Sequence, residues 1–152
     1  MNKEKMQEYI QFAIEKEIEA QEFYLKCSEM TEKPNLKQTF LDYAAEEKRH
    51  EQMLSDFTPE SVQDREVTEQ QDLKIADYFE DMEFSPDMTM QDILIMAMKR
   101  EDSAYQMYTI LAEKGSDSDP AAQKLFRLLA QEELKHKNYF QREYDEHVLR
   151  DN

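Results

Sequence analysis

Glycine and proline are nearly missing from this sequence, which has one glycine and four prolines among its 152 residues. Sheet proteins need turn-forming residues at short intervals, so this scarcity argues against an all-β architecture. Glu, Lys, Gln, Leu, Ala and Met are abundant instead, and these residues favour helix. We therefore expect an all-α protein whose length is typical of a single domain over residues 1–152.

Cysteine pairs, long apolar runs and excess positive charge are also lacking. The one cysteine, Cys27, cannot form an internal disulfide, and no stretch approaches the roughly 18 to 20 apolar residues of a membrane span. The N-terminus has no apolar signal-peptide core, so we expect a cytoplasmic protein with no membrane partner. The formal net charge of −16 repels phosphate backbones, which argues against nucleic acid as a partner.

Four amphipathic stretches predict four long helices. Pro34 and Gly115 are stop signals after the first and third stretch. Thr89 is a favourable N-cap for the third helix, and Asp119 with Pro120 is a favourable start for the fourth. The expected helices span about residues 3–31, 36–57, 89–113 and 120–148.

The connections between these helices predict their arrangement. Helices one and two are joined by a short loop, as are helices three and four, so each pair is expected to form an antiparallel hairpin. The middle connection, about residues 58–88, is long and contains Leu73–Phe79, which we expect to be a short helix across the bundle. Two hairpins joined by a long crossover are the connectivity of ferritin-like four-helix bundles.

The two halves of the sequence resemble each other. Glu17–Tyr24 is similar to Glu101–Tyr108 at an offset of 84 residues, and Ala44–His50 is similar to Ala130–His136 at an offset of 86. A small difference in loop length explains the two offsets. The pattern indicates an internal duplication with pseudo-two-fold symmetry.

Each predicted helix carries one glutamate in the middle of an apolar stripe with steps of three or four residues. The second and fourth helices add a histidine one turn later, in the pattern Glu-x-x-His. Ionised carboxylates inside a core are costly, so four at one level require cations. This arrangement predicts a dimetal site in the bundle core. The candidate ligands are Glu17, Glu47, His50, Glu101, Glu133 and His136.

The types of donor predict the metal and the role of each ligand. Glu47 and Glu133 are expected to bridge two ions, with Glu17 and Glu101 as terminal ligands and one histidine on each ion. Carboxylate-rich sets with one imidazole per metal suit iron or manganese, and the lack of thiolate argues against structural zinc. The alternative is a bundle rotated so that these acids face solvent.

Five further residues are expected around the ligands. Glu46 and Glu132 are placed to accept a hydrogen bond from the histidine of the opposite helix. Tyr24 and Tyr108 lie two turns beyond the terminal glutamates, and Tyr43 lies one turn before a bridging one. Ordinary packing or a solvated face is an equally good interpretation of each.

With these motifs in place, the chain resembles the rubrerythrin-type branch of the ferritin-like superfamily. The resemblance rests on Glu17–Tyr24, Ala45–His50, Lys99–Tyr108 and Ala130–His136, and it extends over nearly the whole chain. It implies two iron ions per chain, with manganese possible from the ligand types. It also implies peroxide reduction to water in many members, and often a homodimer.

Two departures from the rubrerythrin pattern change what is expected. The sequence has no paired Cys-x-x-Cys motifs of a rubredoxin domain, so the electron donor is expected to be a separate protein such as a rubredoxin. An extra family glutamate is replaced by Ala104, which weakens a direct transfer of peroxidase activity. We expect a di-iron oxidoreductase that reduces peroxide or O2. Alternatives are a ferroxidase or iron-storage protein, a manganese catalase, and a structural bundle with a vestigial site.

Overall fold

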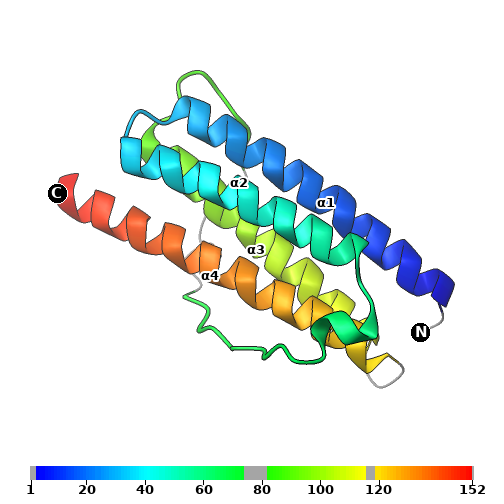
Figure 1. Cartoon of the computed structure of the whole chain (residues 1–152). Helices are drawn as coiled ribbons and strands as arrows, with labels where there is room; N and C mark the ends of the chain where they lie inside the picture. The colour runs from blue at the N-terminus through cyan, green and yellow to red at the C-terminus, as the bar shows by residue number, and fades with distance from the viewer. Residues whose placement is uncertain (1–2, 74–81, 116–118, 152) are drawn as a thin grey trace. The chain divides into compact units, whose positions relative to one another are not determined.

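The computed structural model describes residues 3–73, 82–115 and 119–151, and these residues are helical or irregular, with no strand (Figure 1). The all-α class expected from composition is confirmed. No helix among the described residues combines the length and apolar character needed to cross a membrane. The helices are α1 Lys3–Met30, α2 Pro34–Ser55, the short 3-10 helix η1 Pro59–Val62, α3 Met90–Gly115 and α4 Pro120–Asp151.

Contacts divide the chain into two compact units. Unit 1 comprises Met1–Arg65 and Glu113–Leu125, and therefore holds α1, α2, η1 and the tip of the α3–α4 hairpin. Unit 2 comprises Glu66–Ala112 and Phe126–Asn152, and holds most of α3 and α4. Helix α1 packs on α2, and α3 packs on α4. These are the two hairpins that the loop lengths predict, consistent with a four-helix bundle.

Unit 1 is held together by the apolar stripes of α1 and α2, which run side by side in Figure 1. The ring of Tyr24 stacks on Phe40 with 6.1 Å between centroids and meets Tyr43 edge-on at 5.9 Å. Cys27 is fully buried, as expected for a cysteine on the stripe. Each large side chain buried in this way contributes about 1.5 to 3 kcal/mol, so the aromatic cluster anchors the hairpin.

Unit 2 repeats the aromatic packing of unit 1. Tyr108 and Phe126 stack with 6.3 Å between ring centroids and an interplanar angle of 26°, against 25° for Tyr24 and Phe40. All of these rings are buried. The two stacks are related by the offsets of 84 and 86 residues found in the sequence. The repeated geometry supports the internal duplication.

The crossover is attached to α4 within unit 2. The side-chain amide of Asn138 donates to the carbonyl of Gln71 at 2.6 Å and accepts from the backbone N–H of Leu73 at 3.3 Å. One residue before Gln71, the backbone N–H of Gln70 donates to Oε1 of Gln131 at 2.6 Å. These contacts satisfy backbone groups of an irregular segment and hold it along the helix.

Another part of the crossover lies in unit 1. The helix η1 is closed by Ser61, whose hydroxyl donates to the carbonyl of Thr58 at 2.7 Å. A cavity of about 230 Å³ beside η1 is lined mainly by side chains of α2 and η1, and none of the six candidate ligands lines it.

The short helix expected over Leu73–Phe79 falls largely on residues 74–81, which lie outside the described residues.

The starts of α3 and α4 are capped as the sequence predicts. The hydroxyl of Thr89 accepts from the N–H of Asp92 at 3.1 Å, and the Asp92 carboxylate accepts from the N–H of Thr89 at 3.1 Å. This reciprocal pair satisfies two backbone donors that a helix start leaves unbonded. Asp119 accepts from the N–H of Ala122 at 3.2 Å, with Pro120 as the first helical residue.

The helix boundaries lie close to the expected ones, and two of the small differences have a clear local cause. Helix α2 begins at Pro34 and not near Leu36. Proline suits a first helical position because its fixed φ is helical and its missing N–H would have no partner there. Gly115 is the last residue of α3, and a Cβ at this position would lie 3.2 Å from the backbone nitrogen of Gln123. The only glycine therefore permits a close approach to the first turn of α4.

Candidate metal centre

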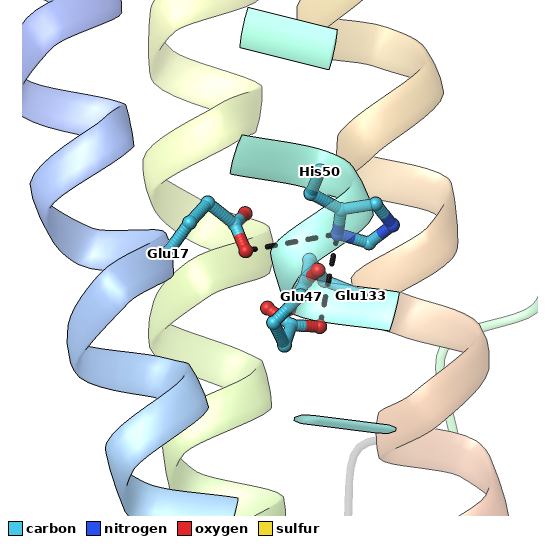
Figure 2. A group of neighbouring side chains, drawn as sticks. All are labelled: Glu17, Glu47, His50 and Glu133. Carbon is cyan, nitrogen blue, oxygen red and sulfur yellow. Dashed lines mark ion pairs between the residues drawn. The ribbon is translucent and has the colours of Figure 1, made fainter. Parts of the chain in front are cut away.

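Unit 1 contains three buried side chains that converge from two helices. Glu17 comes from α1, and Glu47 and His50 come from α2; their exposed fractions are 2%, 1% and 1%. Nδ1 of His50 lies 3.7 Å from Oε2 of Glu17 and 3.7 Å from Oε1 of Glu47. Figure 2 shows both carboxylates turned toward the imidazole. We call these three residues the first half-site.

Unit 2 contains the equivalent three side chains. Glu101 comes from α3, and Glu133 and His136 come from α4; their exposed fractions are 2%, 1% and 2%. Nδ1 of His136 lies 3.7 Å from Oε1 of Glu101, the same distance as in unit 1. We call these residues the second half-site. The alternative in which the acids face solvent does not hold, because all six side chains are buried.

Local helix geometry explains why each half-site forms. Residues three apart on a helix lie on one face, so Glu47 and His50 project together, as do Glu133 and His136. The partner helix of each hairpin adds one glutamate at the same level. The Tyr24–Phe40 stack lies two turns from Glu17 along α1 and fixes the hairpin beside the half-site.

The donor set of each half-site fits a metal ion. In each, the two carboxylates and the imidazole offer ligand atoms within 4.8 Å of one another. A distance of 3.7 Å is longer than a hydrogen bond. It is close to the separation of two atoms that bind one ion at about 2.1 Å each, which is about 3 to 4 Å. Buried carboxylates also need a positive charge to offset their lost hydration.

The second half-site is flanked by a buried ion cluster. Lys137 follows His136 in α4 and has an exposed side-chain fraction of 0%; its ammonium lies 2.7 Å from Asp102 and 2.8 Å from Asp72. Burial alone would lower the pKa of Lys137, but the hydrogen bonds and charges of Asp102 and Asp72 outweigh it and raise the pKa above 10.5. Lys137 is therefore charged at neutral pH.

A comparison with protein-family models assigns the chain to a known family. The family model described as Rubrerythrin matches residues 8–90 and 92–150, which include both half-sites. The chain belongs to the rubrerythrin family. The rubrerythrin family is a ferritin-like di-iron family, and the buried Glu/His clusters are compatible with a di-iron protein. Neither the curated proteins nor the solved structures compared with the chain gave a match.

The other residues expected around a rubrerythrin-type centre have varied surroundings. Tyr24 and Tyr108 are buried and stack on phenylalanine, while Tyr43 is half-buried against Tyr24. Glu46 and Glu132 are half-buried, and Glu46 pairs with an arginine of its own helix at 3.6 Å. Their roles toward the metal ligands stay predictions.

Lys137, Asp102 and Asp72 were not predicted from the sequence. A signal was present for the first two, because each directly follows a candidate ligand on its helix and so lies about 100° further round the same turn. Asp72 had no such signal, because it lies in the irregular crossover. Only the folded chain shows that these three charges meet.

Proposed function

We propose that this rubrerythrin-family chain is a di-iron redox protein that reduces peroxide or O2 with electrons from a separate donor. One observation carries the proposal: the same buried triplet of two glutamates and one histidine occurs in both units. A duplicated donor set is what a centre with two similar metal ions requires. The two half-sites would together form one centre.

Charge balance supports two divalent ions. Glu17, Glu47, Glu101 and Glu133 carry four negative charges when ionised, and all are buried. Two divalent cations offset four carboxylates, whereas one leaves two buried charges without compensation. A neutral imidazole per ion adds a ligand without adding charge.

Each glutamate of the two half-sites would have a defined role toward the two ions. Glu47 and Glu133, from the Glu-x-x-His pairs, would bridge, while Glu17 and Glu101 would be terminal ligands. When bound, two ferrous ions supply one electron each, so that one H2O2 and two protons give two waters. The chain itself contributes a dry, preformed pocket of oxygen and nitrogen donors. The same donors suit manganese, which is the second metal to test.

A second candidate function is ferroxidase or iron-handling activity. Ala104 follows the terminal ligand Glu101 by three residues and Ala20 follows Glu17 by three, so both halves lack a further carboxylate there. A symmetric centre of six ligands has no spare carboxylate to accommodate movement of an ion. The lack of a further carboxylate therefore supports oxidation of ferrous iron as well as it supports reduction of peroxide.

We also propose an electron donor, an oligomeric state and a location for this activity. No Cys-x-x-Cys pair is present in the sequence, which supports a separate electron-donor protein such as a rubredoxin. We propose a cytoplasmic homodimer, since dimers are what the family resemblance implies, and the acidic composition argues against binding to nucleic acid or anionic membranes. Size measurement in solution tests the dimer and distinguishes it from a storage cage.

The proposal is tested by anaerobic loading with two ferrous ions per chain, followed by oxidation with either H2O2 or O2. We expect two irons to bind and peroxide to oxidise them much faster than O2. Fast oxidation by O2 that continues as more iron is added would support the ferroxidase alternative. Failure to bind two ions of iron or manganese would overturn the proposal.

A further inference from the structure

A buried lysine joins three segments of unit 2 beside the second half-site. The ammonium of Lys137 in α4 contacts Asp102 in α3 at 2.7 Å and Asp72 in the crossover at 2.8 Å. Asp102 directly follows Glu101, and Lys137 directly follows His136. The two ligands that lie 3.7 Å apart are thus each one residue from the same ion cluster.

The geometry of the cluster makes it a strong link. Charge-assisted hydrogen bonds of 2.7 to 2.8 Å are among the strongest in proteins. Lys137 has an exposed side-chain fraction of 0%, against 20% for Asp72 and 17% for Asp102, so the cation is the deepest member. A buried ammonium tolerates little movement of its partners, because each lost contact exposes an uncompensated charge.

Among the described residues, the positions equivalent to Lys137 and Asp102 beside the first half-site do not form such a cluster. Glu51 follows His50 where Lys137 follows His136, and Ile18 stands where Asp102 would be. Ile18 is 41% exposed, and Glu51 accepts a hydrogen bond from the amide of Gln21 at 2.7 Å. The two halves therefore share the candidate ligands and the aromatic stack, whereas, in the part of the chain that the structure describes, the Lys137 cluster has its counterpart positions occupied by Ile18 and Glu51.

We propose that Lys137 is a positioning residue for the second half-site, holding α3 and the crossover against α4 through Asp102 and Asp72. The cluster keeps Glu101 and His136 at the separation that one ion needs. This inference rests on the proposed function, because it assigns Lys137 a role in metal binding. Asn138 and Gln131 assist by fixing the same stretch of crossover to α4.

The test is anaerobic titration of the apo-protein with Co²⁺, whose visible absorption reports each bound ion. Lys137→Met removes the charge and keeps much of the volume, and Lys135→Met is the matched control, exposed on the same helix. We expect wild type and Lys135→Met to bind two Co²⁺ per chain. Lys137→Met should bind one of the two at least tenfold more weakly, and Asp102→Asn should reproduce this if Lys137→Met fails to fold.

A thermal melt of each variant with and without Co²⁺ separates positioning from general stabilisation. A positioning role predicts that Lys137→Met loses part of the stability gained on Co²⁺ binding, since that gain follows affinity. An equal loss in apo and loaded forms, with two Co²⁺ bound at wild-type affinity, would overturn the inference alone. Wild type that fails to bind two Co²⁺, Mn²⁺ or Fe²⁺ would overturn the proposed function as well.

Discussion

At the scale of single residues, we expect substitutions of the proposed bridging glutamates to have the largest effect on metal content. Glu47 is 1% exposed and lies 3.7 Å from the imidazole of its own helix. If it bridges, Glu47→Ala should remove both ions from the chain, because each ion loses a ligand and the charge balance is broken. Glu133→Ala should do the same.

Metal analysis after anaerobic loading measures this effect as ions bound per chain. Asp42→Ala is the control, because it removes an exposed carboxylate from the same helix as Glu47. It should keep both ions. Full occupancy of two ions in Glu47→Ala would show that this glutamate does not bridge.

The sequence pattern predicted that the six candidate ligands are buried, and the structure confirms their burial, but it did not predict the buried ion cluster beside the second half-site. The six candidate ligands were recognisable because a charged side chain on an apolar stripe conflicts with its own surroundings. Lys137 raises no such conflict, since a lysine one position off the stripe is usually solvated. Its partner Asp72 lies 65 residues away in an irregular segment. Contacts of that kind depend on the folded path of the crossover.

At the scale of elements, the two aromatic stacks make the duplication testable. Phe40 and Phe126 each have an exposed fraction of 0% and stack on an equivalent tyrosine. Phe40→Ala and Phe126→Ala should each lower the free energy of unfolding by about 3 to 5 kcal/mol, through lost burial and a cavity. Urea unfolding of the apo-protein measures both, and the two values should be similar.

Phe12→Ala is the control for this pair, because Phe12 is 46% exposed and packs only partly against Lys16 of its own helix. It should change the free energy of unfolding far less. A small effect of one core substitution beside a large effect of the other would mean that the two hairpins are unequally packed, despite their matching geometry.

The elements themselves were largely predictable, and the differences have local causes. Periodic apolar stripes identify all four helices because burial of one face dominates helix stability. The start of α2 at Pro34 was missed because proline both stops one helix and begins the next. Helix α3 ends at Gly115, as the stop signal predicts, but the close approach of Gln123 is a tertiary contact that no local pattern reveals.

At the scale of the whole molecule, the acidic charge is the dominant feature. The formal net charge is −16, and four of the carboxylates are proposed metal ligands.

The connectivity of the helices was predictable from the sequence, because short loops force neighbouring helices into hairpins. The identity of the metal was not predictable, since the ligand types suit several ions, and the separate electron donor stays a proposal.

The excess of negative charge predicts that salt stabilises the apo-protein. Repulsion among like charges destabilises a compact state, and raising KCl from 20 to 500 mM shortens the screening length from about 20 Å to about 4 Å. The melting temperature of the apo-protein should therefore rise by several degrees, and by less once two divalent ions are bound. NaCl should act like KCl, because screening does not distinguish the cations. A melting temperature that falls with salt would instead mean that exposed ion pairs outweigh the net repulsion.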